Sequence, residues 1–490
     1  MATPSRSLDP RLPVLVGLGG ASAGAPVAEL MTAAVRAAAA DAGAPGLLAS
    51  VDCVVVPHGS WSLTDPARTV ARRIGSPWAR TVLCQVGVSQ QEVINHALAA
   101  VAAGEFHTVV VVGGEARAWA RAGAVEDDEE RQPPDELLTR PPDIVAPIER
   151  AAGIVLPPVL QYALIENALG SSEHLSCVQQ RDQIAALWAR FNAVAAHNSE
   201  AAFPEPRSAT EIATPAPGNR PLAYPYNRWH ASQWTVDQSY ALIICSADQA
   251  RAAGVPPERW LFPHVALHCS RAVTLTARPR LSAWPAMTAV GRTAEHHTGR
   301  PLRELQLTEV YSCFPAAVRV QQRALGLDPE GTPTLTGGMS FAGGPFNHFV
   351  LQSMGTLGRR LRDDPGELGL VTTVSGLLSK PGLALWSASP PTAGRGPLLA
   401  DLADEAMAAS EVVPVVDRPP IRPTPATVVS FTVTYGGEAG LEPERTAIVA
   451  DLPDGVRTAA TCEDAQTARL AVTEGLIGRV VEVKDTTFSL

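Results

Sequence analysis

Residues 86–116 read VGVSQQEVINHALAAVAAGEFHTVVVVGGEA, a helix pattern followed directly by a strand pattern. Ser89 and Glu92 have the spacing of a capping box, in which each side chain bonds the other residue's backbone N–H, and Gly104 is typical of a helix end. The strand that follows is apolar without alternation, as in a strand buried on both faces of a parallel or mixed sheet. The stretch predicts a helix at 89–104 and a buried strand at 107–116.

The same alternation of strand and helix patterns extends in both directions. Residues 12–19 and 51–59 are strand-like and residues 27–43 form an Ala-rich amphipathic helix pattern, while 239–254 again places a helix after a buried strand. A second section of the same kind runs from 260 to 391. Two such sections predict an α/β fold with two duplicated halves, each with a sheet covered by helices on both faces.

Three further sections depart from this alternation. Residues 117–235 place acidic and Pro-rich loops between polar helices, which predicts an insertion. Residues 396–425 are predicted as an extended linker because five prolines fall within 414–425. Short β-rich segments with turn signals follow at 426–490 and predict a small OB-like β-barrel. The predicted units are a first half at 10–255 with the insertion at about 117–235, a second half at 256–395, the linker and the barrel.

Charge and cysteine use limit the class of protein. The 39 basic and 49 acidic residues give a net charge of −10, which argues against nucleic-acid binding. The seven cysteines are scattered without a C-x-x-C pair, so we expect reduced thiols, no metal site and a cytoplasmic location. The N-terminus has no signal-peptide core, and no apolar stretch approaches the roughly 20 residues of a membrane helix, so no membrane association is expected.

Four blocks resemble the thiolase superfamily in their order and spacing. They are residues 86–116, 224–250 (YPYNRWHASQWTVDQSYALIICSADQA), 307–327 (LTEVYSCFPAAVRVQQRALGL) and 335–348 (LTGGMSFAGGPFNH), followed by VTTVSGLLSKPG at 371–382. The chain is similar to sterol-carrier-type thiolases, of the acetyl-CoA acetyltransferase kind, and to actinobacterial thiolase-like proteins with a C-terminal β-barrel. The resemblance implies the thiolase fold, with two five-stranded mixed sheets and a loop domain inserted in the first half.

Thiolases make or break a carbon–carbon bond in acyl-CoA with four catalytic groups, and the resemblance places each group on a residue of this chain. The nucleophilic Cys falls on Gly87, the His of the G-H-P motif on Gly344, the Asn or His of the second motif on Tyr311, and the acid/base Cys near Val374. All four are substituted, so thiolysis through an acyl-cysteine is not expected. The backbone N–H groups of Gly87 and Gly376 correspond to the family's oxyanion donors.

Three polar side chains near these positions are candidate catalytic residues. Tyr311 has a phenol that donates a hydrogen bond or acts as acid or base, and Asn347 and His348 directly follow the G-G-P sequence, where they would fill the space left at Gly344. The alternatives are that Tyr311 is a packed aromatic residue and that His348 opens a helix. Cys84 and Ser89 are better explained as a strand residue and a helix cap.

The resemblance leaves three functions open. The first is an acyl-CoA-binding, thiolase-like protein of lipid metabolism, with CoA as part of the substrate and no further cofactor. The second is a lyase on β-hydroxyacyl-CoA through Tyr311, because tyrosine at this position resembles the thiolase-superfamily aldolases of steroid side-chain degradation, which work with an OB-fold partner. The third is a non-catalytic scaffold whose barrel recruits a partner enzyme.

Ligand contacts and oligomeric state are further expectations. Trp229 and His230 lie where thiolases meet CoA, and Arg228 or Arg220 would meet its phosphates. The alternative is that these aromatic residues anchor the insertion. Thiolases dimerise through a strand near the nucleophile, here 81–87, unless the barrel covers that edge, so homodimer and monomer both stay open.

Overall fold

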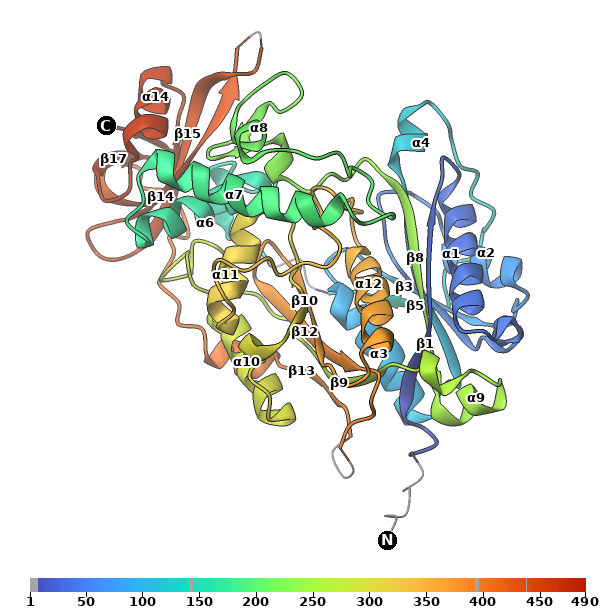
Figure 1. The fold of residues 1–490 in the computed structure, drawn as a ribbon. Helices are drawn as coiled ribbons and strands as arrows, with labels where there is room; N and C mark the ends of the chain where they lie inside the picture. Colours follow the sequence, from blue (N-terminus) through green and yellow to red (C-terminus); the bar gives the residue numbers. More distant parts are fainter. Residues whose placement is uncertain (1–7, 141–143, 393–395, 438) are drawn as a thin grey trace.

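A computed structural model describes residues 8–140, 144–392, 396–437 and 439–490 (Figure 1). Two mixed sheets form its body, which confirms the predicted α/β fold with two halves. The first sheet has the order β1 (Pro13–Ser22), β8 (Asp237–Ser246), β4 (Thr108–Ala116), β2 (Cys53–Pro57), β3 (Arg80–Cys84) and β5 (Glu136–Leu138). The second has the order β10 (Leu307–Glu309), β11 (Gly369–Ser375), β12 (Lys380–Ser387), β9 (Phe262–His268) and β13 (Leu398–Asp401).

Helices form three layers around and between these sheets. Helices α3 (Gln90–Ala103) and α12 (Phe349–Asp363) lie between the sheets and contact strands of both. Helices α1 (Val27–Asp41) and α2 (Pro66–Ile74) cover the outer face of the first sheet, and α10 (Pro285–Thr298) and α11 (Pro315–Leu325) that of the second (Figure 1). The beginnings of α3 and α12, which follow two of the predicted catalytic positions, therefore lie between the two sheets.

Helix α3 begins and ends where the sequence predicts. The Ser89 hydroxyl accepts a hydrogen bond from the Glu92 N–H at 3.1 Å, and Gly104 adopts a left-handed conformation with φ of 77°. The capping box also predicts a hydrogen bond from the Ser89 N–H to the Glu92 carboxylate. This prediction is wrong, because the Glu92 carboxylate pairs with the Arg140 guanidinium instead. A buried carboxylate is better stabilised by a full positive charge than by one backbone dipole.

The first sheet has six strands instead of five. The sixth, β5, belongs to the insertion and pairs in parallel with β3, with Val82 opposite Glu136 and Cys84 opposite Leu138. Asp135 anchors this strand by accepting hydrogen bonds from the Thr81 N–H and from Arg68, both at 2.9 Å. The edge of the strand before Gly87 is thus covered by the insertion, and not by the barrel as considered above.

The prediction of a linker over 396–425 is wrong for its first part. Strand β13 pairs in parallel with β9, and α13 (Ala403–Ala408) follows it. The short apolar run Leu398–Leu399 is enough for an edge strand, and no proline interrupts it. Residues 409–423 form no helix, but Val415 makes a parallel bridge with Arg457 of the C-terminal section, so this segment is attached to the folded chain.

The C-terminal section forms a closed set of strands. Strand β14 (Thr424–Gly436) pairs with both β15 (Glu442–Asp451) and β17 (Val480–Lys484), and β16 (Arg457–Cys462) pairs with β15 and β18 (Thr487–Ser489). Helix α14 (Ala465–Glu474) connects β16 to β17, and β17 pairs with β18.

The barrel is joined to the insertion by main-chain hydrogen bonds. Strand β6 (Pro221–Ala223) pairs with β14 through Ala223 and Thr434, and the Tyr224 N–H donates to the Val433 carbonyl at 2.8 Å. The barrel lies beside the insertion helices α6 (Val159–Ser172) and α7 (Cys177–Ala195) (Figure 1). The remaining short elements are α4 (Arg117–Arg121), α5 (Pro147–Ala151), α8 (Ala209–Ala213), α9 (Ala247–Ala252), β7 (Tyr226–Asn227) and the 3₁₀ turns Pro45–Ser50, Arg228–His230, Pro257–Arg259 and Leu302–Glu304.

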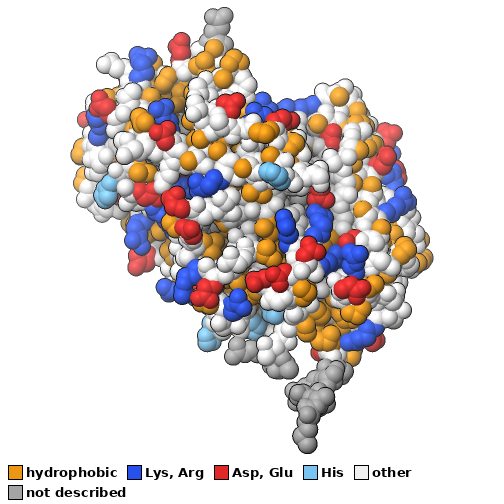
Figure 2. All heavy atoms as spheres, in the orientation of Figure 1, with side chains coloured by type: hydrophobic (Ala, Val, Ile, Leu, Met, Phe, Trp, Pro, Cys, Tyr) orange, Lys and Arg blue, Asp and Glu red, His pale blue; other side chains and the backbone are white. Residues whose placement is uncertain are grey.

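Basic and acidic side chains are interspersed on the face drawn in Figure 2. Among the helices that the structure describes, none is both long and apolar enough to cross a membrane.

Candidate functional site

The beginnings of the two central helices meet at a buried glutamine. The Gln90 side chain lies in the first turn of α3, accepts a hydrogen bond from the Val350 N–H at 2.7 Å and donates one to the Tyr311 hydroxyl at 3.4 Å. Gln90 thus joins α3, α12 and the loop after β10. The sequence analysis missed this residue, although a polar side chain at the start of a buried helix is a recognisable signal.

Gly87 lies three residues before the start of α3, and Gly376 follows β11 directly. Gly87 has φ of 109° and Gly376 has φ of 60°, and both values favour glycine. The buried ammonium of Lys380, directly after the β11–β12 turn, donates to the Gly87 carbonyl at 3.3 Å. Lys380 therefore joins the beginning of β12 to the loop that leads into α3. Val374 is a buried residue of β11, opposite Pro381.

Gly344 has no room for the side chain that thiolases carry at this position. A Cβ atom there would lie 2.2 Å from the Ser232 hydroxyl oxygen and 2.9 Å from the Met339 carbonyl oxygen. Backbone hydrogen bonds hold the two segments together, from Gly344 N–H to the Gln233 carbonyl at 2.9 Å and from Gln233 N–H to the Met339 carbonyl at 3.1 Å. Ser232 therefore takes the space, and not Asn347 or His348 as hypothesised above.

Tyr311 is buried, with its ring edge against Phe349 at a centroid distance of 5.9 Å. Burial raises the pKa of its phenol well above the ordinary value, so the group stays protonated. The hydroxyl oxygen accepts a hydrogen bond from Gln90, and the hydrogen bonds of the described residues include no acceptor for its proton. The hydroxyl proton of Tyr311 is therefore not used in a hydrogen bond within the described part of the chain.

A thiol and a second phenol lie beside Tyr311. Burial raises the pKa of Cys313 to about 12, so this thiol is not a nucleophile at neutral pH. The Cys313 side chain bonds with that of Tyr162, whose ring stacks on Phe314 at 4.5 Å. The sequence analysis assigned neither Cys313 nor Tyr162 to the site, and Tyr162 carries no signal because it lies on an insertion helix.

His348 and Asn347 face the first sheet. The His348 side chain packs on Gly113 of β4, and burial lowers its pKa to about 3, so it is neutral. The Asn347 amide donates to the His58 carbonyl at 3.2 Å. Within the described ranges, no hydrogen bond or ring contact joins either residue to Tyr311. The three candidate catalytic residues are thus not brought together.

The side chains of residues 228–230, which the sequence analysis predicted to contact CoA, contact other groups of the protein. Trp229 stacks on Phe341 at 6.1 Å and lies under the Arg207 guanidinium at 3.8 Å. The buried His230 ring accepts a hydrogen bond from the Asn227 N–H at 3.0 Å, and Arg228 donates to Gln233 at 3.2 Å. These contacts are those of an aromatic anchor for the insertion, which was the alternative.

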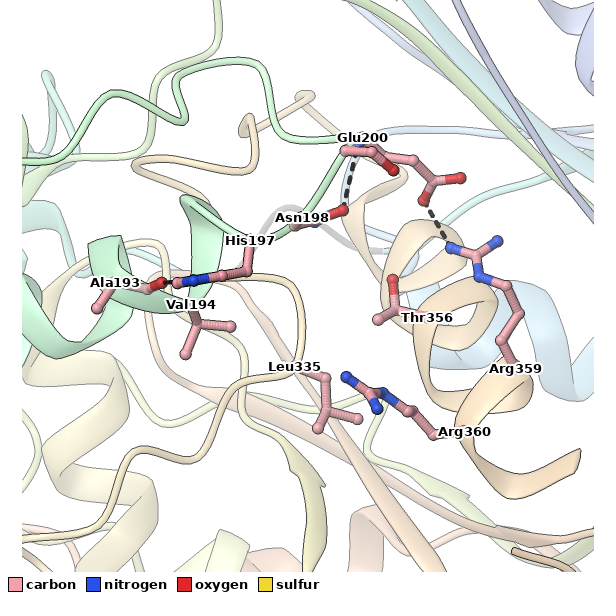
Figure 3. Close-up of a pocket in the computed structure, with 10 residues that line it drawn as sticks. Ala193, Val194, His197, Asn198, Glu200, Leu335, Thr356, Arg359 and Arg360 are labelled. Atoms are coloured by element: carbon pink, nitrogen blue, oxygen red, sulfur yellow. Dashed lines mark hydrogen bonds and ion pairs between the residues drawn. The ribbon is translucent and has the colours of Figure 1, made fainter. Parts of the chain in front are cut away.

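A cavity of about 700 Å³ lies between the end of α7 and α12 (Figure 3). Its residues include none of the positions discussed above, and its Arg359 is paired with Glu200 at 2.6 Å. The junction at Gln90 is therefore separate from it. Among the described residues, no group of three or more His, Cys, Asp or Glu side chains is placed to hold a metal ion.

Comparisons of this chain with known proteins find solved structures with the same fold. Neither a scan against protein-family models nor a search of curated proteins gave a match. Among solved structures, the chain is similar to a monomeric SCP2-thiolase-like protein type 1 from Mycobacterium smegmatis, with a TM-score of 0.83 and 28% identity over 98% of this chain and 99% of that one. The Ltp2–ChsH2(DUF35) aldolase (TM-score 0.58, 18% identity, 78% of this chain, 99% of that one) and the dimeric peroxisomal thiolase of Saccharomyces cerevisiae (0.57, 13%, 78% and 98%) share the fold. The fold of this chain is that of the thiolases, and over its whole length the chain is similar to an SCP2-thiolase-like protein.

Proposed function

We propose that this protein binds an acyl-CoA at the junction of α3 and α12 without thiolysing it. The observation that carries the proposal is the environment of Gly344, where Ser232 takes the space of the thiolase histidine. The nucleophile position is Gly87, and the nearby Cys313 thiol is protonated at neutral pH because burial raises its pKa. Two kinds of donor support binding of a thioester oxygen: the phenol of Tyr311, whose proton has no acceptor among the described residues, and the amides of Gly87 and Gly376, which the resemblance assigns as oxyanion donors.

Calorimetric titration tests this proposal. We expect saturable binding of acetyl-CoA, and we expect Tyr311→Phe to weaken it about tenfold because one hydrogen bond to the thioester oxygen is lost. The matched ligand is free CoA, which has no thioester oxygen and whose affinity should not change in the variant. Equal losses for both ligands, or no binding of either by the wild type, would contradict the proposal.

A lyase function has one specific observation in its favour, the proton of the Tyr311 hydroxyl without an acceptor. Retro-aldol cleavage breaks the bond between the α and β carbons: water takes the proton of the β-hydroxyl as the aldehyde carbonyl forms, and the electron pair of the broken bond stays on the α carbon as a thioester enolate. A phenol donor would stabilise this enolate, whose α carbon then takes up a proton from water. If this activity exists, incubation with a β-hydroxyacyl-CoA releases an aldehyde, and Tyr311→Phe lowers the rate at least 100-fold. Release at the wild-type rate by the variant would exclude this role of Tyr311.

We further infer that the C-terminal barrel is OB-like. Its three strands, helix and two strands follow each other in the order of an OB-fold, and β16 pairs in parallel with β18. Recruitment of a partner enzyme through this barrel remains the scaffold alternative. It would be supported by a stable complex in the absence of acyl-CoA binding.

The covered edge of β3 predicts a monomer. Strand β5 occupies the backbone groups of β3 that a second copy would need for sheet extension. Although partial burial opposes ionisation, Arg68 and Thr81 lower the pKa of Asp135, so its anchoring carboxylate stays charged. Sedimentation at micromolar concentration should give one species of 51.4 kDa. A dimer that persists on dilution would contradict this reading of β5.

A further inference from the structure

A second cavity, of about 680 Å³, opens beside α10 and α11 and reaches the β11–β12 turn. Its inner wall includes Ser379, whose hydroxyl donates to the carbonyl of Gly376. Trp284, Val320 and Met407 supply apolar wall. The cavity therefore joins the outer surface of the second half to the turn that carries one of the oxyanion glycines, and its volume is that of a cofactor-sized pocket.

The lining of this cavity is strongly basic in a chain of net charge −10. Its charged residues are five arginines and a single acid, Glu411. Two of the arginines, Arg280 and Arg292, are exposed, and the structure gives neither an ion pair nor a hydrogen bond for their guanidinium groups within its described ranges. The unpaired charge of these two groups in a concave surface attracts anions. Of the other three arginines, Arg271 and Arg323 pair with Asp404 and Glu173, and the third is Arg278.

Arg278 is a buried cation without a carboxylate partner. It is 6% exposed, and its guanidinium donates to the carbonyl oxygens of Val273 and Leu377, each at 3.3 Å. Its Nη1 atom is buried and has no hydrogen-bond partner. Burial lowers its pKa to about 10, so the group is still charged at neutral pH. The Glu149 carboxylate attracts this cation but makes no ion pair with it, so a bound anion would stabilise it further.

The first turn of α10 adds to this potential. Pro285, Ala286 and Thr288 line the cavity, and no side chain caps the beginning of the helix at Trp284. The N-terminus of a helix of this length carries partial positive charge and unpaired N–H groups, which bind phosphate. The helix terminus and the unpaired arginines are independent features that favour the same ligand chemistry.

We propose that this cavity binds the phosphorylated end of CoA, its 3′-phospho-ADP group, while the thioester end lies towards Gly376. The inference rests on the proposed acyl-CoA binding and identifies where the anionic part of the ligand docks. Arginine suits this role because its guanidinium binds phosphate oxygens with two parallel hydrogen bonds. Arg228, one of the two arginines expected from the sequence, is already engaged by Gln233 and by the Trp229 ring.

The test titrates the full-length protein with acetyl-CoA and with adenosine 3′,5′-bisphosphate at low ionic strength. The variant Arg280→Gln/Arg292→Gln removes two charges from exposed positions, so folding is preserved. We expect about 100-fold weaker binding of both ligands, about tenfold for each lost charge-assisted contact. The matched control is Arg300→Gln, an exposed arginine just beyond α10 that does not line the cavity, and it should bind both ligands as the wild type does.

The possible results separate this inference from the function on which it rests. Unchanged acetyl-CoA affinity in the double variant overturns the docking site but leaves acyl-CoA binding intact. Bisphosphate binding that depends on Arg280 and Arg292, without any binding of acetyl-CoA, keeps the phosphate site and refutes the acyl-CoA function. No binding of either ligand by the wild type refutes both. If the double variant and Arg300→Gln lose the same amount of binding affinity, the change in net charge explains the loss. That result would overturn the site.

Discussion

Replacement of Arg319 by methionine is expected to lower the free energy of unfolding by about 4 kcal/mol. The Arg319 side chain is 8% exposed and bonds the fully buried carboxylate of Glu166 and, at its other end, Glu173. Glu166 also accepts a hydrogen bond from the Tyr226 hydroxyl at 2.7 Å. Methionine keeps the apolar stem but leaves Glu166 as a buried charge without its cation, which is the costly way to break a buried ion pair.

Urea unfolding with a matched control measures this effect. Arg323 lies one turn further along α11, is 36% exposed and bonds only exposed or half-buried groups, among them Glu173. Arg323→Met should therefore cost less than about 1 kcal/mol. Addition of Glu166→Gln to Arg319→Met should recover part of the loss, because the uncompensated charge is removed. Similar losses in the two single variants would show that burial does not govern this network.

Replacement of Gly344 by alanine is expected to destabilise the protein by about 2 kcal/mol. The added Cβ would lie 2.2 Å from the Ser232 hydroxyl oxygen and 2.9 Å from the Met339 carbonyl oxygen, so the backbone must shift. The matched double variant Ser232→Gly/Gly344→Ala should recover much of the loss, because it removes the nearer of the two atoms. Thermal unfolding of the three proteins measures the recovery.

The same geometry predicts the outcome of an attempt to restore a thiolase. Gly344→His combined with Gly87→Cys would return two catalytic residue types but would place the imidazole where Ser232 now lies. We expect a less stable protein without thiolysis. Two results would contradict this account: a Gly344→Ala variant as stable as the wild type, or thiolysis by the variant Gly87→Cys/Gly344→His. Either would show that Ser232 can move away and leave room for a side chain at position 344.

The elements that could be predicted from the sequence are those whose signals are local. Helix α3 follows from Ser89 at its beginning and Gly104 after its end, and β4 follows from its continuous apolar run. The position of Tyr311 at the junction follows from the order of the motifs in the chain. Each of these depends on spacing along the chain, which the sequence displays directly.

The features that the sequence analysis missed depend on neighbours far away in the chain. Strand β5 has only three residues, Glu136–Leu138, and exists because β3 offers a free edge and Asp135 binds Thr81. The occupation of the space at Gly344 by Ser232 joins residues more than one hundred positions apart. The arginine-lined cavity draws on several elements at once. No local pattern encodes such contacts, so only the folded chain reveals them.

The central claim, acyl-CoA binding without thiolysis, is tested most directly by one assay. The purified protein is mixed with acetoacetyl-CoA and free CoA at the concentrations at which calorimetry detects acyl-CoA binding, and the loss of acetoacetyl-CoA is followed over time. We predict saturable binding and a loss no faster than in buffer. CoA-dependent turnover at an ordinary enzymatic rate, on the order of 1 s⁻¹ or more, would contradict the account.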